Sequence, residues 1–422
     1  MIATLDLRDS YAMSWTRDRL QADARWAAGW TTTALGFTIP IWVVADSILV
    51  VLLVVCWLAS GEWKARVRRI TQNPVAVSVL LLFAWLLLGT LWGGGSVQER
   101  ALSIKKYADL LLIPLLISMA IDLQERHRAV LALAVSLVGT LILSLGLSAG
   151  FLPLTNEALG CDPSDSCVFK RHTTHNVLMA FGVLLFAVLA WNSSHRWMRW
   201  GWGGAAVLAA CNVLVMVQGR TGYAVLAGLA MLVFYVRFGW RGMLVAIVLL
   251  CVVFLSAYQI SSSFHERVDL TAAGIRQWDP NVAVVNDSVG WRLEYVYHTV
   301  ELIQDHPLVG VGTGGFVQAY RARTEQASLD VPPHPHNQYL FIMAQVGVLG
   351  FGLLLWLFVQ QWRWTTLASD TATGLLARGL IVVMIVTCFF QPALNDHTEK
   401  LFYCLFSGLM WSENDPQLET KS

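Results

Sequence analysis

Long apolar runs separated by short polar stretches limit what this chain can fold into. A helix needs about 20 apolar residues to cross the hydrocarbon core of a membrane, and such runs follow one another from residue 27 to residue 413. Hydrophobic residues make up 56% of the chain and charged residues only 14%, which is typical of a protein whose main solvent is lipid. The sequence therefore predicts an all-α polytopic membrane protein.

About twelve membrane spans are expected from the apolar runs. They cover residues 27–44, 46–60, 75–93, 108–121, 129–151, 174–192, 203–218, 222–238, 242–260, 338–361, 375–391 and 399–413. The two closest pairs are broken at Asp46 and at Gly219-Arg220-Thr221, and each pair is predicted to form a helical hairpin.

Lys and Arg residues collect in alternate loops, as cytoplasmic loops of membrane proteins do. One basic loop holds Lys64, Arg66, Arg68 and Arg69, and it lies on the same side as the basic N-terminal segment. We therefore expect both termini in the cytoplasm and a long segment, 261–337, on the opposite face, which in a bacterial chain is the periplasm. No cleavable signal peptide is expected, because the first 25 residues are charged and mixed.

Three parts follow from this layout: residues 1–260 with spans one to nine, residues 261–337 with the functional side chains, and residues 338–422 with the last three spans and a cytoplasmic tail. Within the long segment, Asp287-Ser288 is predicted to cap a helix that continues to about Asp305 and stops at Pro307.

Glycines at 310, 312, 314 and 315 predict a flexible turn after that helix. No parallel strand precedes them, so the spacing does not indicate a dinucleotide fold. We interpret the turn as backbone that passes close to something and offers free N–H groups, and Gly312 is a candidate substrate contact for that reason.

Cys161 and Cys167 bracket a polar loop, whereas the other five cysteines lie in apolar runs, where a thiol behaves as a small core residue. Such a pair could close a disulfide in an oxidising compartment. The sequence leaves open whether it does.

Two arginines are the main candidates for anion recognition. The formal net charge of +1 gives no global field to attract nucleic acid, so binding of an anion depends on single cations. Arg220 is expected at the outer rim of the bilayer and Arg292 on the outer helix. Two converging guanidinium groups match the oxygens of a diphosphate. The alternative for each arginine alone is that it extends to water or pairs with a carboxylate.

Further phosphate contacts are assigned to Arg100, Lys105 and Lys106 in an outer loop, with simple solvation as the alternative.

His336 is the best candidate for a general base, because a histidine with a near-neutral pKa can accept a proton from a hydroxyl group. His334 and Asn337 beside it are candidate substrate contacts, although Asn337 could instead cap the helix beginning at Gln338. His334 and His336 also form a His-x-His pattern. A metal site is not predicted, because no Cys or carboxylate lies at the expected local spacing.

The order of four motifs resembles the O-antigen ligase and polymerase family of bacterial envelope proteins. They are Gln218-Gly219-Arg220-Thr221-Gly222, Trp291-Arg292-Leu293-Glu294-Tyr295, His306-Pro307-Leu308-Val309-Gly310-Val311-Gly312 and His334-Pro335-His336-Asn337. The resemblance implies a membrane glycosyltransferase of GT-C type in the bacterial inner membrane, with its active site facing the periplasm. Its ligases join an undecaprenyl-diphosphate-linked polysaccharide to the outer-core sugar of lipid A-core.

Carried over to this chain, the family's two functional arginines match Arg220 and Arg292 and its functional histidine matches His336. The resemblance implies that the arginines bind the diphosphate while His336 deprotonates the acceptor hydroxyl, with inversion at the anomeric carbon. It implies no metal and no other cofactor. The expected partners are the lipid-linked donor, the lipid A-core acceptor and membrane lipids, with the protein acting as a monomer.

Three other functions remain open at this stage. An O-antigen polymerase uses the same donor but a second lipid-linked glycan as acceptor, and a protein O-oligosaccharyltransferase uses a protein. A transporter would also have many spans, but it favours charged residues near the middle of the bilayer, between repeated halves.

Overall fold

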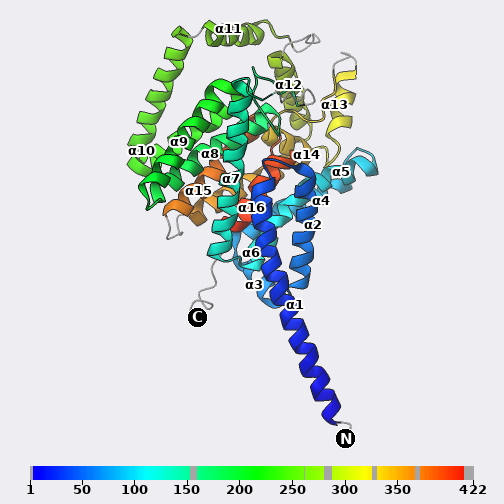
Figure 1. The fold of residues 1–422 in the computed structure, drawn as a ribbon. Coiled ribbons are helices and arrows are strands. Elements are labelled where there is room, and N and C mark those ends of the chain that lie inside the picture. The colour runs from blue at the N-terminus through cyan, green and yellow to red at the C-terminus, as the bar shows by residue number, and fades with distance from the viewer. Residues whose placement is uncertain are drawn as a thin grey trace.

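The computed structural model describes residues 3–152, 159–260, 262–279, 288–325, 330–365 and 371–412. The regular structure within these ranges is helical, without a β-strand (Figure 1). The all-α prediction is therefore confirmed. The cytoplasmic tail expected after the last span lies beyond the described residues.

The helices follow one another along the chain as α1 (Ala3–Thr38), α2 (Val43–Ala59), α3 (Trp63–Gln72), α4 (Pro74–Leu88), α5 (Val97–Tyr107), α6 (Leu112–Met119), α7 (Leu123–Ser148), α8 (His172–Asn192), α9 (Arg196–Cys211), α10 (Arg220–Ile260), α11 (Ser262–Gln277), α12 (Ser288–Asp305), α13 (Phe316–Thr324), α14 (Gln338–Thr365), α15 (Thr371–Phe390) and α16 (His397–Met410). Short turns of 3-10 helix, η1 (Gly89–Leu91) and η2 (Ala108–Leu111), flank α5, and a π-helical turn, η3 (Asn212–Met216), follows α9.

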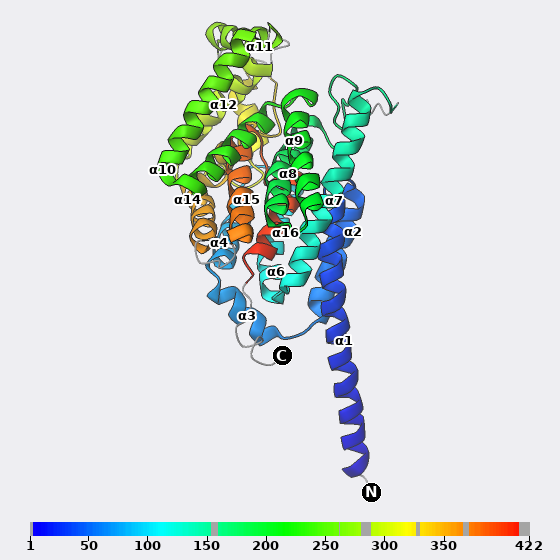
Figure 2. The same cartoon turned by 60° about the vertical axis from the view of Figure 1, so that its left-hand side comes forward.

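The two ends of the helical bundle carry different elements. Helices α11, α12 and α13 gather at the end drawn uppermost in Figure 1, whereas α1 begins, and α3 lies, at the lower end in both views (Figures 1 and 2). The basic segment at 64–69, predicted as a loop, is instead part of helix α3. The described helices of segment 261–337, α11 to α13, therefore lie at the opposite end of the bundle from this basic helix.

Helix α16 forms the centre of the core. Every residue from Thr398 to Leu409 is buried, and α16 packs against α6, α8 and α15. Large apolar side chains stay exposed on α2 and α10, for example Val51 and Val253. An apolar surface of this kind is what a membrane-spanning helix presents to lipid.

The expected number of about twelve spans is not confirmed. Among the described residues, six helices are long and apolar enough to cross a membrane, or seven if α2 and α3, bent by 115°, form one broken span. Three of the apolar runs that were counted as spans form short helices instead. The 14 residues of α16, for example, reach only about 21 Å along the helix axis. This is less than the thickness of a bilayer core, about 30 Å. The predicted spans 222–238 and 242–260 are the two limbs of α10, which is kinked between them at Gly239, with φ 64 and ψ −154.

The two predicted hairpin breaks have different outcomes. The break at Gly219 is confirmed, because η3 ends at Met216 and α10 begins at Arg220. The first break is displaced. Asp46 lies inside the first turn of α2 and accepts a hydrogen bond of 2.6 Å from the hydroxyl of Thr38, the last residue of α1.

The helix predicted from Ser288 to about Asp305 is confirmed as α12. Its proposed cap at Asp287 lies outside the described residues. The sequence analysis did not identify α11 or α13, which flank α12 in the same segment.

Helix α14 is broken, and the glycine turn at 310–315 supplies hydrogen-bond donors to the carbonyl groups at the break. Residues 346–347 leave helical geometry, with Gly347 at φ 69, so carbonyl groups in the preceding turn lose their partners within the helix. The N–H groups of Val311 and Gly312 donate to the carbonyls of Ala344 and Gln345, each at 2.8 Å. The prediction of free N–H groups is therefore wrong for Gly312, whose N–H is used inside the protein.

The same turn confirms that the backbone passes close to a neighbour. Gly312 has φ 86, and a Cβ atom added to it would lie 2.3 Å from the Cα atom of Gly93, so only glycine fits there. The glycine motif thus joins the loop after α4 to the broken helix α14. Its role is structural, and it holds the helix that His336 precedes.

Candidate active site

Arg220 and Arg292 come from different elements and lie close enough for their charges to interact. Arg220 is the first residue of α10, and Arg292 lies in the first two turns of α12. The pKa of Arg292 is lowered, first because the surrounding protein partly desolvates its guanidinium group and second because of the charge on Arg220. Both side chains remain accessible from outside.

Neither guanidinium group has a hydrogen bond or an ion pair with another described residue. Two cations are thus held near each other without a carboxylate to neutralise them, although burying or crowding charges is unfavourable without a counter-charge. The arrangement can accommodate an anion with several oxygen atoms.

His336 belongs to the same group of residues. The charge of Arg292 lowers the pKa of His336, as a second cause after burial of the imidazole. Its ring stacks on Tyr295, with centroids 6.0 Å apart and planes 15° from parallel. Tyr295 lies three residues after Arg292, and residues at this spacing share one face of a helix. Helix α12 therefore supplies both the cation and the aromatic ring that face His336.

The backbone at His336 is held in the left-handed region, with φ 54. A non-glycine residue in this conformation costs about 1–3 kcal/mol and occurs preferentially at functional sites. His336 is the second residue before α14, so the strained residue directs the chain into that helix. The depressed pKa keeps the imidazole neutral near pH 7, the form that accepts a proton.

His334 contacts His336 edge to face, with ring centroids 4.6 Å apart. Burial, then His336, then Lys106 lower the pKa of His334 to about 4. Its Nδ1 atom is buried without a hydrogen bond in the described part of the chain. No third Cys, His or carboxylate of the described residues joins the two rings in an arrangement that could hold a metal ion.

Asn337 caps α14, as the alternative interpretation proposed. Its Oδ1 atom accepts from the N–H of Leu340 at 3.0 Å, and its Nδ2 atom donates to the carbonyl of Phe389 at 3.2 Å. Both ends of the side chain are used within the protein. The capping role is therefore confirmed, while substrate contact by Asn337 stays a prediction.

The three cations predicted on the outer loop lie on α5 and have different surroundings. Arg100 donates to the carbonyl of Thr90 at 2.8 Å, and its side chain lies against Gly93 and Gly314. Arg100 thus joins the loop after α4 to the glycine turn, and its contact with phosphate stays a prediction. Lys105 is exposed.

Lys106 lies nearest the candidate active site among these three cations. Its charge acts on His334 and also on Asp396. Lys106 is exposed, so its ammonium group remains available to a ligand.

Asp396 was not among the site residues predicted from the sequence. It lies at the start of α16, where burial and the neighbouring Glu399 raise its pKa to about 7, while Lys106 acts in the opposite direction. The only local signal is an acidic residue before a helix that turned out to be fully buried, and many helix caps share it.

The motif around Arg220 is fitted closely to α8. A Cβ atom added to Gly219 would lie 2.4 Å from Nδ2 of Asn176, so the chain can pass there only as glycine. Asn176 Nδ2 donates to the carbonyl of Val217 at 3.1 Å. The two glycines of this motif therefore allow the backbone to pass close to α8. Arg220 is the exposed charged residue of the motif.

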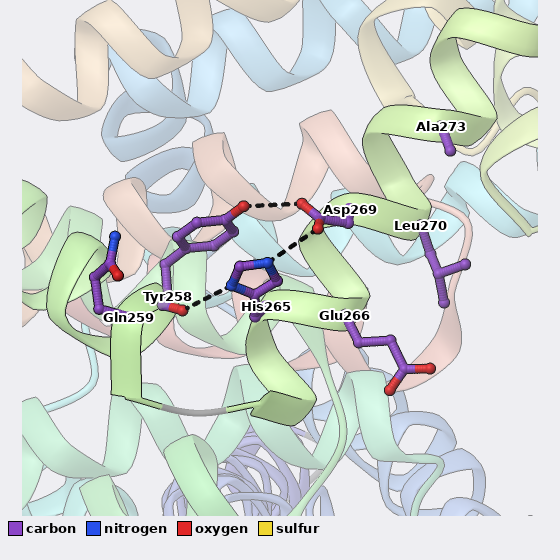
Figure 3. A pocket seen from close by; sticks show the side chains of 7 residues that line it. All are labelled: Tyr258, Gln259, His265, Glu266, Asp269, Leu270 and Ala273. Carbon is purple, nitrogen blue, oxygen red and sulfur yellow. Dashed lines mark hydrogen bonds and ion pairs between the residues drawn. The ribbon is translucent and has the colours of Figure 1, made fainter.

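A separate cavity of about 650 Å³ opens at the elbow between α10 and α11 (Figure 3). Tyr258 donates to Asp269 at 2.9 Å, and His265 pairs with the same carboxylate at 3.1 Å. We call these three residues the elbow cluster. Its polar groups satisfy one another, and no site residue predicted from the sequence lines the cavity.

Residues 204–357 match the model of a protein family described as O-antigen ligase. The matched segment includes Arg220, Arg292 and His336, and it ends within α14. No curated protein matches the chain.

Proposed function

We propose that this chain, whose residues 204–357 match the O-antigen ligase family model, transfers O-antigen polysaccharide from undecaprenyl diphosphate to the outer-core sugar of lipid A-core. The protein is then a membrane glycosyltransferase of GT-C type in the bacterial inner membrane, with its active site facing the periplasm. One chain supplies all three proposed site residues, and we propose that the enzyme acts as a monomer among membrane lipids.

The observation that carries this proposal is the pair of unpartnered guanidinium groups. Arg220 and Arg292 repel each other, and no described carboxylate compensates for this. A diphosphate offers several anionic oxygens to the two planar donor forks, and charge-assisted hydrogen bonds of this kind are the strong ones. Lys106 adds a third cation on the side of His334.

The proposed reaction exchanges one bond at the anomeric carbon of the donor sugar for another. Neutral His336 removes the proton from the acceptor hydroxyl as its oxygen attacks this carbon. The bond from the carbon to the diphosphate oxygen breaks on the opposite face, which inverts the configuration. Negative charge grows on the leaving diphosphate, and Arg220 and Arg292 stabilise it. Tyr295 keeps the imidazole oriented by stacking on it.

Purified protein should be tested with lipid-linked polysaccharide and lipid A-core, and the product followed on a gel. We expect transfer by the wild type and its loss in Arg220→Ala, Arg292→Ala and His336→Ala. Arg276→Ala is the matched control, because Arg276 is an exposed arginine on α11 in the same outer segment. Full activity in the three site variants would refute the assignment.

The acceptor used in this assay separates the family's alternatives. Transfer to a second lipid-linked chain would identify a polymerase, and transfer to a protein would identify an oligosaccharyltransferase. Movement of substrate across vesicles without a new glycosidic bond would identify a transporter.

A further inference from the structure

A small disulfide-closed loop lies against the segment that leads into Arg220. Cys161 and Cys167 form a disulfide, with their Cα atoms 5.1 Å apart, so the pairing that the sequence left open is present. We call residues 161–167 the disulfide loop. Both cysteines are buried and pack on Val217.

The disulfide loop binds Gln218, two residues before Arg220, in two places. The N–H of Gln218 donates to Asp165 Oδ1 at 3.1 Å, and its side-chain Nε2 donates to the carbonyl of Ser164 at 3.2 Å. Just before it, the N–H of Ser166 donates to the carbonyl of Met216 at 3.2 Å. The loop thus holds this segment by its backbone and by a side chain.

The loop is itself a tight turn. Asp162 and Asp165 exchange two backbone hydrogen bonds of 3.1 Å, and Asp162 Oδ1 also accepts from the backbone of Ser164. The disulfide closes the two ends of this turn, which reduces the conformations that the loop can adopt. Asp165 is therefore presented to Gln218 in a fixed position.

The other side of the segment is fixed by the π-helical turn η3. Asn212 donates to Ser144 Oγ at 2.7 Å and pairs with His175 at 2.9 Å, while Gly219 lies against Asn176. Turns of π-helix of this kind frequently mark functional positions. The backbone before α10 is thus held from both sides, whereas the guanidinium group of Arg220 has no described partner that could orient it.

We propose that the Cys161–Cys167 disulfide and Asp165 act as a positioning device for Arg220, so that affinity for the lipid diphosphate depends on this loop. The inference rests on the proposed function for the identity of the ligand. In this proposal the loop acts through α10 and not by touching the ligand. It sets where α10 begins, and the position of Arg220 relative to Arg292 follows from that.

Hydrogen exchange at the Gln218 amide tests the positioning without substrate. Asp165→Ala removes the acceptor, and we expect exchange of residues 216–218 to accelerate by about tenfold, because the amide loses its bond to a carboxylate. Asp165→Asn keeps an Oδ1 acceptor of the same shape and should retain most of the protection. Equal exchange in wild type and Asp165→Ala would overturn the proposal, whether or not the protein proves to be a ligase.

Binding and kinetics test the consequence for the ligand. We expect Asp165→Ala and the double variant Cys161→Ser/Cys167→Ser to weaken binding of undecaprenyl diphosphate and to raise KM for the lipid-linked donor by about tenfold, with KM for lipid A-core unchanged. Cys251→Ser is the control, because Cys251 is an exposed free cysteine on α10. If the double variant fails to fold, Asp165→Ala, which retains the disulfide, decides the question.

An unchanged KM for the donor in a folded Asp165→Ala variant would refute the positioning role. An equal rise in KM for the donor and for lipid A-core would also refute it. If the wild-type protein transfers nothing, the proposed function is refuted. The hydrogen-exchange rates of residues 216–218 still test whether the disulfide loop positions Arg220, because that measurement needs no substrate.

Discussion

The elbow cluster and the candidate active site are both groups of polar side chains, and they differ in whether their members are paired. Tyr258, His265 and Asp269 satisfy one another (Figure 3), so their cavity has a structural explanation. Arg220 and Arg292 have only each other's repulsion among the described residues. The unpaired charges are therefore our reason for proposing the ligand site at the two arginines and not at the elbow cavity.

The largest effect is expected at His336. His336→Ala should lower the rate of transfer by about 10²- to 10⁴-fold, the usual contribution of general base catalysis, with little change in binding of undecaprenyl diphosphate. Single-turnover rates and donor affinity measured together test this. Normal transfer by this variant would show that His336 is not the general base. The site would then be supported only as a surface that binds an anion.

Removal of one guanidinium group should give the next largest loss. Arg292→Ala is expected to lower kcat/KM for the donor by about 10²- to 10³-fold, since the lost donors stabilise charge that grows in the transition state. Arg292→Lys keeps the charge without the planar fork, and its activity should fall between those of the wild type and Arg292→Ala. Equal activities for the Ala and Lys variants would show that geometry matters more than charge.

The pH dependence should show the link between Arg292 and His336. His336 must be neutral to accept a proton, so kcat/KM is expected to rise with pH through the pKa of His336 and then level off. Burial and the charge of Arg292 lower this pKa, which puts the midpoint below the ordinary histidine value of about 6.5.

Arg292→Gln removes one of these two causes, so the midpoint should move upward, whereas Arg292→Lys should leave it low. The residual activity of both variants, measured across the pH range, provides the comparison. If the midpoint stays the same in Arg292→Gln, the charge of Arg292 does not act on the pKa of the catalytic base.

The smallest effect is expected at the elbow cluster. Asp269→Asn weakens the pairing with His265, but exposed pairs contribute little, so the transfer rate should change by less than about twofold. A large loss of activity in this variant, with normal expression and folding, would make the elbow cavity part of the active site. The contrast between paired and unpaired clusters would then fail.

Local patterns predicted several parts of the fold and the site. Helix α12 was predicted because a possible cap at Asp287-Ser288 and a stop at Pro307 delimit it. The break before Arg220 was predicted because Gly219-Arg220-Thr221 separates two apolar runs. Arg220, Arg292 and His336 were identified from motif order, and the structure brings them together. Their roles in catalysis stay predictions.

Other features depended on partners far along the chain. Asn337 was predicted to contact substrate, but it caps α14 and bonds to Phe389. Gly312 was expected to offer a free N–H, but the break in α14, which no local pattern indicated, uses that donor. Arg100, for which phosphate binding stays a prediction, donates to the carbonyl of Thr90.

The sequence by itself determined that this chain is a helical membrane protein, because apolar content and helix boundaries depend on residues that are neighbours along the chain. The tertiary structure alone decided which polar groups remain available. A hydrogen bond between residues such as Gly312 and Gln345 forms only after α14 breaks and the turn packs into it. A polar group is available to a ligand only if no such long-range hydrogen bond uses it. The order of residues alone therefore does not show which groups are available.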